Sequence, residues 1–363
     1  MDRWAIDITR DRIDAASLVT DQDAPLAEGE IELKPTLIAI TANNITYAAL
    51  GEPMGLLGPD AGYWDFFGPR DAPGRLPVWG FATVTRSAHP DIEEGDAYYG
   101  YYALASHTRM RPDKVNDHGF VDASSHRAHL PALYNHYQAV GMLADYDPAD
   151  RDLWPIYRPL YLTGWLIADQ LIDERDHGAA VVVVTSASSK TAMSFAHAFG
   201  ERAARPELVG LTSPASVAFV AATGLYDRVV AYDAIESLDA AIPTALVDIA
   251  GDAGLAARIH AHFGDALKLS MVVGATHWQD RGSVGGTRRT GFFAPARMAK
   301  RSSEWGGGAL RDRIAVAWRG FMADARALTP VERRSGAEAA LDTYREVVAG
   351  KADPRVGVVI AFP

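Results

Sequence analysis

The sequence predicts an α/β protein that combines a small β-barrel with a doubly wound parallel sheet. The prediction rests first on residues 179–184, Ala-Ala-Val-Val-Val-Val, where the lack of polar alternation indicates a strand with both faces covered. A change of period follows, because apolar residues recur at i, i+3, i+4 and i+7, which is the stripe of a helix: Ala192, Phe195, Ala196 and Phe199. Strands and helices then alternate along the rest of this half of the chain.

Strands of the barrel are expected in the first half of the chain. Three segments are rich in Val, Ile, Thr, Tyr or Phe between Gly and Pro residues: 30–41, 77–86 and 96–106. The intervening segment 51–77 is too long to be structureless in a compact domain, so we expect it to cover something. The tail 355–361 reads Arg-Val-Gly-Val-Val-Ile-Ala and predicts one more strand, which completes the first domain.

The second half has the number and order of elements of a doubly wound sheet. A helix begins near Pro155 and leads into the valine strand. Later in the chain, Ser213 is expected to be the N-cap of a further helix that has Pro214 at its first position. The remaining strands are expected at 207–212, 228–232, 245–250 and 268–274.

Composition excludes several classes of function. At 363 residues the chain is long enough for two domains. Its net charge of −11 argues against a nucleic-acid surface, which needs clustered Lys and Arg. The absence of cysteine excludes disulfides, Cys-ligated zinc and a thiol nucleophile. We find neither an apolar run of about 18 residues nor a charged-then-apolar leader, so we expect a cytoplasmic protein without membrane insertion or export.

The turn after the valine strand is the first candidate functional site. It reads Ser186-Ala-Ser-Ser-Lys-Thr-Ala and opens a helix, whose unpaired N–H groups and positive dipole end attract anions. Hydroxyl groups can bond phosphate oxygens, and a lysine adds a charge of the right sign. The residues expected to bind phosphate are Ser186, Ser188, Ser189, Lys190 and Thr191. Alternatively, Ser188 or Ser189 merely caps the helix and Lys190 points to water.

Several stretches share their order and spacing with a known family. They are Ala27-Glu-Gly-Glu-Ile-Glu-Leu-Lys with Ala42-Asn-Asn-Ile-Thr-Tyr, Pro77-Val-Trp-Gly-Phe-Ala-Thr-Val, Ile92-Glu-Glu-Gly-Asp-Ala-Tyr-Tyr-Gly-Tyr-Tyr-Ala, Leu162-Thr-Gly-Trp-Leu-Ile-Ala-Asp and Val348-Ala-Gly-Lys-Ala-Asp. On these stretches the chain resembles the zinc-free, quinone-oxidoreductase-like branch of the medium-chain dehydrogenase/reductase superfamily. The resemblance implies a GroES-like β-barrel domain over residues 1–152, completed by 321–363, and a Rossmann nucleotide-binding domain over 153–320.

The turn that begins at Ser186, called the phosphate turn below, departs from the sequence pattern of this family. Its members usually have G-x-G-x-x-G or A-x-x-G-x-x-G there, and this chain has no glycine, which indicates a divergent subfamily. An NAD-preferring domain usually has an acid about 20 residues further on, whereas here the strand ends in Thr212 and Ser213, which favours NADP(H). Alternatively, Ser213 only caps its helix. The resemblance adds three expected cofactor neighbours: Thr163, Gly274 and Ala275.

The resemblance also locates an active-site turn at 43–47. Zinc enzymes of the superfamily have a cysteine ligand in this turn, and Asn44 stands about where that ligand would be. An amide is a poor zinc ligand, so no metal is expected. The substrate must then be polarised by hydrogen bonds, for which the turn offers Asn44, Thr46 and Tyr47. Tyr47 could also donate a proton.

Residues 117–137 take the place of the zinc lobe and are dense in His, Tyr and Asn. They supply two further catalytic candidates, His129 and Tyr134. His118, His126 and His129 also allow a metal-site interpretation, with His126 and His129 sharing a helix face. Surface or capping histidines are commoner than metal ligands, and we predict no metal-binding residue.

Two further segments bear on substrate and assembly. Aromatic residues near the expected cleft could line a pocket for a planar or apolar substrate, or simply form core: Trp64, Phe66, Phe67, Tyr98, Tyr99, Tyr101 and Tyr102. Segment 282–305 is rich in Arg and Gly without apolar periodicity. We interpret it as a mobile flap or a dimer contact, the alternative being a solvated loop, and we expect a homodimer.

These observations favour a metal-free, NADPH-dependent reductase that delivers hydride to a carbonyl or an activated C=C bond of a small substrate. The lack of glycine in the phosphate turn supports a different class, a non-catalytic nucleotide-binding or interaction protein on the same scaffold. A non-redox lyase that uses the same cleft is a third hypothesis. We expect neither nucleic acid nor a membrane as a partner.

Overall fold

The computed structural model describes residues 3–53, 57, 60–273 and 289–362. The chain divides into two compact units, Met1–Ile156 with Pro330–Pro363, and Tyr157–Thr329. Within the described residues, no helix is both long and apolar enough to cross a membrane. Each unit is treated separately below.

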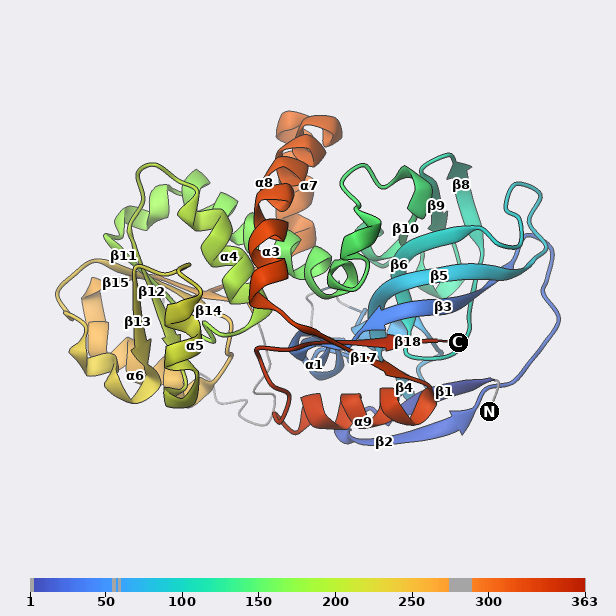
Figure 1. Ribbon diagram of the computed structural model, residues 1–363, viewed down its shortest axis with the longest axis horizontal. Helices are drawn as coiled ribbons and strands as arrows, with labels where there is room; N and C mark the ends of the chain where they lie inside the picture. Colours follow the sequence, from blue (N-terminus) through green and yellow to red (C-terminus); the bar gives the residue numbers. More distant parts are fainter. Residues whose placement is uncertain (1–2, 54–56, 58–59, 274–288, 363) are drawn as a thin grey trace. The chain divides into compact units, whose positions relative to one another are not determined.

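The first unit consists mainly of antiparallel strands (Figure 1). A three-stranded sheet has the order β2-β1-β4, and a nine-stranded sheet has the order β17-β18-β3-β5-β6-β10-β9-β8, with β7 paired to β3. The strands are β1 (Trp4–Thr9), β2 (Arg12–Thr20), β3 (Ile31–Ala39), β4 (Gly74–Arg75), β5 (Pro77–Ser87), β6 (Ala97–Ala103), β7 (Thr108–Met110), β8 (Pro112–Asn116), β9 (Gly119–Asp122), β10 (His136–Ala139), β17 (Val331–Ser335) and β18 (Gly357–Ala361). The expected tail strand therefore lies in this sheet, against β3.

Short helices join these strands. They are α1 (Ala42–Ala49), η1 (Tyr63–Phe66), η2 (Ser125–Arg127), α2 (Ala132–Asn135), η3 (Val140–Met142), η4 (Pro148–Asp150) and α9 (Ala337–Val348), where η denotes a 3-10 helix. The long segment before β5 covers part of the core, as expected, because the side chains of Trp64 and Phe66 are fully buried.

Strand β6 distributes its tyrosines to both faces of the sheet, since successive side chains of a strand alternate. Tyr99 and Tyr101 contact the ring of Trp79 on one face. Tyr98 contacts Phe120, and Tyr102 contacts Tyr137. All four tyrosines are buried, so this cluster forms core.

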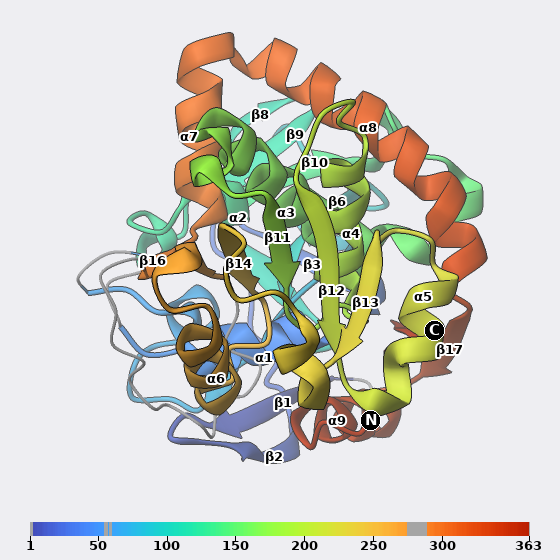
Figure 2. The ribbon, with the colours of Figure 1, turned by 90° about the vertical axis from the view of Figure 1, so that its left-hand side faces the viewer.

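The second unit has a parallel six-stranded sheet of order β13-β12-β11-β14-β15-β16 (Figure 2). The strands are β11 (Val181–Val184), β12 (Glu207–Thr212), β13 (Arg228–Ala231), β14 (Thr244–Asp248), β15 (Leu267–Val272) and β16 (Arg289–Gly291). The helices are α3 (Leu153–Asp173), η5 (Arg175–Gly178), α4 (Lys190–Gly200), η6 (Pro214–Ser216), α5 (Val217–Ala222), η7 (Tyr232–Ser237), α6 (Ala253–Phe263), η8 (Gly264–Ala266), α7 (Ala294–Trp305) and α8 (Gly307–Leu328).

The valine strand is covered on both faces, as predicted. Val182 and Val184 pack into a core with side chains of α3 and α4, while Val181 and Val183 pack into a second core with η7 and α6. Chain order reverses between β11 and β14, which makes the carboxyl ends of these two strands the topological switch point. The doubly wound sheet is therefore confirmed.

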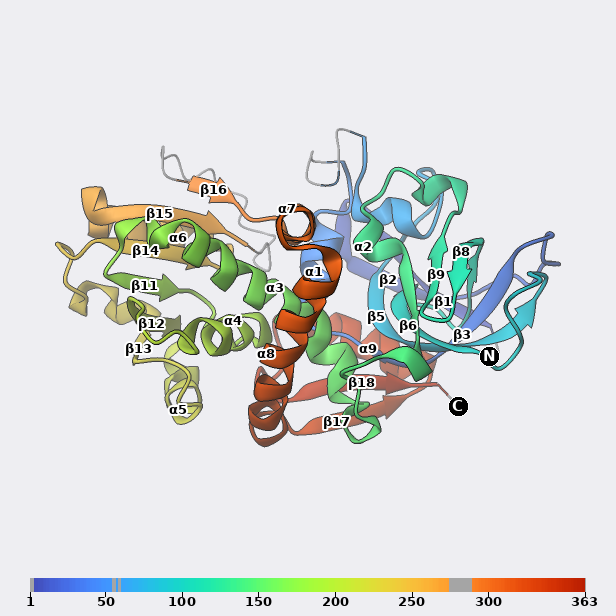
Figure 3. The same ribbon diagram turned by 90° about the horizontal axis from the view of Figure 1, so that it is seen from above.

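Helix α7 corrects the interpretation of segment 282–305 as an irregular flap or loop (Figure 3). Its two buried side chains are arginines: Arg297 and Arg301 donate to Asp169 of α3, at 2.6 Å and 2.8 Å. Charge pairing therefore stabilises a helix whose pattern gave no helical signal. Residues 282–288 lie outside the described residues.

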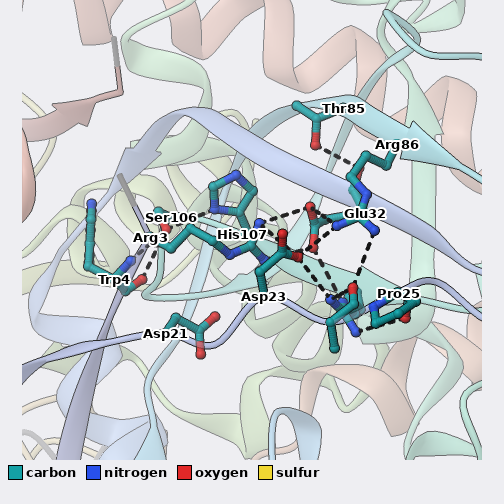
Figure 4. A network of polar contacts seen from close by, with 12 residues as sticks. Arg3, Trp4, Asp21, Asp23, Pro25, Glu32, Thr85, Arg86, Ser106 and His107 are labelled. Atoms are coloured by element: carbon teal, nitrogen blue, oxygen red, sulfur yellow. Dashed lines mark hydrogen bonds and ion pairs between the residues drawn. The ribbon is translucent and has the colours of Figure 1, made fainter. Parts of the chain in front are cut away.

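A buried carboxylate organises the start of the chain (Figure 4). Glu32 of β3 is 1% exposed and accepts two hydrogen bonds from Arg3, at 3.1 Å and 2.8 Å, and one from Arg109 at 3.3 Å. Asp23 pairs with Arg86 at 2.7 Å beside it. Burial acts to raise the pKa of Glu32, but the hydrogen bonds from Arg3 and Arg109 outweigh burial and hold the pKa below its ordinary value.

We predict that Glu32→Gln lowers the free energy of unfolding by about 2–3 kcal/mol at neutral pH, because two guanidinium groups lose their shared charged acceptor. The folded-state pKa of Glu32 is depressed, so its contribution is complete above its unfolded pKa and is lost as pH falls through the folded value. Urea unfolding should therefore show a gap between wild type and variant that narrows below about pH 4. A constant gap across pH, or an equal loss in the exposed control Glu28→Gln, would contradict this assignment.

Candidate functional site

The turn after β11 closes without glycine because two tyrosines hold its backbone. Ser186 has a φ of +56°, a left-handed conformation that L-residues other than Gly, Asn and Asp seldom adopt. Its N–H donates to the hydroxyl of Tyr232 at 3.0 Å. The hydroxyl of Tyr226 donates to the carbonyl of Ala187 at 2.8 Å, and the N–H of Ala187 donates to the carbonyl of Leu211 at 2.9 Å. The turn is thus fixed from η7, β12 and the residues that precede β13.

The glycine that this arrangement needs lies in the neighbouring strand. A Cβ atom at Gly210 of β12 would lie 2.9 Å from the ring of Tyr226 and 3.0 Å from the Cβ of Ala187, so only glycine fits without a shift. Sequence reasoning missed Gly210, Tyr226 and Tyr232. The available signal was weak, since nothing in the pattern of one chain relates a strand glycine to a turn some twenty residues earlier.

The predicted phosphate residues gather at the N-terminus of α4. Ser189 is the N-cap, and its hydroxyl accepts a hydrogen bond from the N–H of Ala192 at 3.2 Å. The hydroxyl of Thr212 lies 3.4 Å from that of Ser188, so the ends of β11 and β12 bring these two candidates together. Lys190 and Thr191 are half-buried in the first turn of the helix. The capping interpretation therefore describes what Ser189 does in this structure.

The other expected cofactor neighbours are placed differently. Thr163 lies on α3, and its hydroxyl donates to the carbonyl of Pro159 at 2.9 Å within the same helix. Ser213 precedes a 3-10 turn instead of an α-helix, and its hydroxyl donates to Ser216 at 3.2 Å without capping a backbone N–H. Gly274 and Ala275 lie outside the described residues.

A buried carboxyl group joins β11 to β14 at the switch point. The hydroxyl of Thr185 donates to Asp248 at 2.8 Å and accepts the N–H groups of Ile249 and Ala250 at 2.9 Å and 3.0 Å. Asp248 is 2% exposed, and burial raises its pKa. The backbone next to the phosphate turn is therefore held by side chains as well as by the sheet.

The predicted active-site turn is a helix, α1, and the side chain of Asn44 helps to cap its N-terminus. Its side chain accepts the N–H of Thr41 at 2.7 Å, as part of a capping box, and donates to the carbonyl of Pro77 at 2.9 Å. Asn44 is buried and its side chain bonds backbone groups, so its role in polarising a substrate stays a prediction. Thr46 is also buried on this helix.

Tyr47 of α1 belongs to a cluster of four buried tyrosines. Its ring centroid lies 4.7 Å from that of Tyr63, 5.5 Å from Tyr101 and 6.4 Å from Tyr134. The hydroxyls of Tyr63 and Tyr134 are hydrogen-bonded at 3.1 Å. The indole N–H of Trp79 donates to the hydroxyl of Tyr47 at 3.2 Å. The structure thus brings together Tyr47 and Tyr134, two candidates far apart in sequence.

Burial keeps these phenols protonated. It raises the pKa of Tyr47, Tyr63, Tyr101 and Tyr134 above the ordinary value of 10, in each case as the largest cause. Neutral phenols donate hydrogen bonds in an apolar surrounding, where such bonds are strong. Sequence reasoning did not predict that Tyr63 and Trp79 belong to this cluster, because α1, η1, β5 and α2 meet only through long-range packing.

The histidines of segment 117–137 do not converge. His129 and His118 are exposed. His126 lies on the 3-10 helix η2, and its Nε2 contacts the carbonyl oxygen of Phe66 at 3.2 Å. In the parts of the chain that the structure describes, no group of three or more His, Asp or Glu side chains is arranged to hold a metal ion.

Comparison with solved structures identifies the fold. CurA from Vibrio vulnificus, in complex with NADPH, matches over 99% of both chains with a TM-score of 0.61 and 13% sequence identity. CurK enoyl reductase matches over 100% of both chains, with a TM-score of 0.53 and 12% identity, and the CurF ER cyclopropanase also over 100% of both, with a TM-score of 0.54 and 11% identity. A comparison with curated proteins finds no significant match.

The fold is therefore that of the medium-chain dehydrogenase/reductase superfamily, a GroES-like barrel domain combined with a Rossmann domain, as the sequence predicts. The chain belongs to the family described as "Protein of unknown function (DUF2855)", whose model matches residues 38–353. The expectation of a divergent subfamily is confirmed.

We predict that Ser186→Gly raises the free energy of unfolding by about 0.5–1 kcal/mol, because glycine removes the penalty of a left-handed serine while its own flexibility offsets part of the gain. Chemical denaturation measures the difference. Ser188→Gly is the matched control in the same turn, where φ is not positive, and it should lose stability. A destabilised Ser186→Gly variant would show that the serine side chain itself stabilises the turn.

Proposed function

We propose that this protein is a metal-free, NADPH-dependent oxidoreductase that delivers hydride to a carbonyl or activated C=C bond of a small apolar or aromatic substrate. The observation that carries the proposal is the hydrogen bond from Trp79 to the hydroxyl of Tyr47. An indole N–H can only donate, so the oxygen of Tyr47 accepts and its own hydrogen is left to donate elsewhere. The NADPH complex of CurA and the enoyl reductase CurK, which share the fold, support the choice of reaction class.

The residues at the turn after β11 suit the diphosphate and 2′-phosphate of such a cofactor. The N-terminus of the 11-residue helix α4 faces this turn with Ser188, Lys190 and Thr191, a set of hydroxyl and ammonium donors. Strand β12 ends in Thr212 and Ser213 instead of a carboxylate that would repel the 2′-phosphate. Ser189 contributes less, since its hydroxyl caps the helix.

In the proposed reaction, the side chains of this protein position the substrate and supply a proton. NADPH, when bound, supplies the hydride that forms the new C–H bond and is thereby oxidised. The electron pair of the reduced double bond moves to the substrate oxygen, or to the enolate oxygen of a conjugated system, next to the hydroxyl of Tyr47. Tyr47 stabilises that charge by its hydrogen bond and then gives its proton, which leaves a phenolate.

The binding prediction is that NADPH binds and NADH binds more weakly, as measured by fluorescence titration of the purified protein. Lys190→Ala should weaken NADPH binding by about tenfold or more, because one charge-assisted phosphate contact is worth roughly 1.5–3 kcal/mol. Lys268→Ala is the control, since this exposed lysine is the second residue of β15 and donates to the carbonyl of Asp265. Equal affinities for the two cofactors refute the preference. No binding below about millimolar, where ΔG is only about −4 kcal/mol, refutes the enzyme and favours a non-catalytic scaffold.

The catalytic prediction is that Tyr47→Phe lowers kcat by about a hundredfold with unchanged NADPH affinity, because one donor to the developing charge is lost. Tyr102→Phe is the control, since its hydroxyl donates to the carbonyl of Tyr98 on the opposite face of β6.

Activity should also persist in a strong chelator, with no stoichiometric zinc by elemental analysis. Full activity in Tyr47→Phe, or one zinc per chain, would disprove the assignment.

A further inference from the structure

Several side chains surround the hydroxyl oxygen of Tyr47 in a way that a neutral phenol does not require. Trp79 donates to it from β5 at 3.2 Å. The ring of Tyr101 from β6 meets the ring of Tyr47 edge-on, with centroids 5.5 Å apart. Tyr101 is fully buried, and among the described residues its hydroxyl has no partner in hydrogen-bonding geometry. A buried hydroxyl without a partner is unfavourable, so its presence calls for an explanation.

We infer that Trp79 and Tyr101 are positioning residues, which stabilise Tyr47 in the ionised state that follows proton transfer to the substrate. In this inference the hydroxyl of Tyr101 lacks a partner because its acceptor, the phenolate oxygen of Tyr47, exists only after the transfer. The inference rests on the proposed role of Tyr47 as the proton donor. It adds to that role a reason why so deeply buried a phenol can release its proton.

The electrostatics of the cluster support this assignment. Burial raises the pKa of Tyr47, while the side chains of Trp79, Asn43 and Tyr101 each act in the opposite direction, as hydrogen-bond donors to the ionised form. The titratable groups whose rings contact Tyr47 are Tyr63 of η1, Tyr101 of β6 and Tyr134 of α2, all of them neutral phenols. The contacts to Tyr47 are thus uncharged donors, which favour a phenolate without holding a permanent charge nearby.

The geometry of the strands explains why this donor set is preserved by the fold. Trp79 and Tyr101 are paired across β5 and β6, so their side chains leave the sheet on the same face. Their rings pack at 4.9 Å, and the ring of Tyr134 packs on Tyr101 at the same distance. The Tyr101 hydroxyl is therefore held in place by ring packing alone, and it can be removed without changing the shape of the core.

The decisive experiment measures the ionisation of Tyr47 directly. Fluorinated tyrosine, whose lower intrinsic pKa brings the titration into the range where the protein is folded, is incorporated in place of tyrosine and followed by fluorine NMR. The resonance of Tyr47 is assigned by its loss in Tyr47→Phe. Tyr101→Phe and Trp79→Phe should each raise the pKa of Tyr47 by about one unit, since a hydrogen bond to a charged group is worth at least that much.

Tyr101→Phe should also be at least as stable to urea as the wild type, because it removes an unpartnered polar atom. Tyr102→Phe, on the other face of the same strand, should leave the titration of Tyr47 unchanged. An unaltered Tyr47 titration in Tyr101→Phe, or a marked loss of stability, would overturn the inference and assign Tyr101 a purely structural role. The measurement needs neither cofactor nor substrate, so it is independent of the NADPH titration that tests the proposed function.

Discussion

The hydrogen bonds that Tyr226 and Tyr232 form with the turn after β11 are the constraint on which the second unit of this protein depends. A parallel sheet with both faces covered places the carboxyl end of its central strand at the switch point, where a ligand binds. The turn there must reverse tightly, and glycine usually permits this. Here the backbone reaches the left-handed region at Ser186, and the tyrosines fix it there. Gly210 in the next strand makes the space for one of them.

In the barrel half, the comparable constraint is the exclusion of water from four phenols. Tyrosine hydroxyls need partners when buried, and this cluster supplies some of them internally, through Tyr63 with Tyr134 and Trp79 with Tyr47. The same burial that makes each phenol hard to ionise also makes each remaining donor strong. In the proposed function, such donors polarise the substrate by hydrogen bonding.

Sequence reasoning predicts the fold well, because periodicity reports local structure directly. The valine strand, the stripe of α4 and the strands around residues 207–212 all lie where the pattern indicates. It predicts the site less completely. Tyr47 and Tyr134 are recognisable as candidates by residue type, but Trp79, Tyr63 and Tyr101 join them only through strand pairing and packing. The sequence also does not reveal that the side chain of Asn44 takes part in the capping box of α1.

The ion pairs that hold α7 make its attachment to the second unit sensitive to salt. Most helices here attach by apolar stripes, whose release exposes surfaces that aggregate. Helix α7 packs Met298 against the apolar core and Trp305 against Trp165 of α3, but its two buried side chains, Arg297 and Arg301, pair with the carboxylate of Asp169. These pairs weaken as salt rises, and their separation would expose charged groups that water solvates readily.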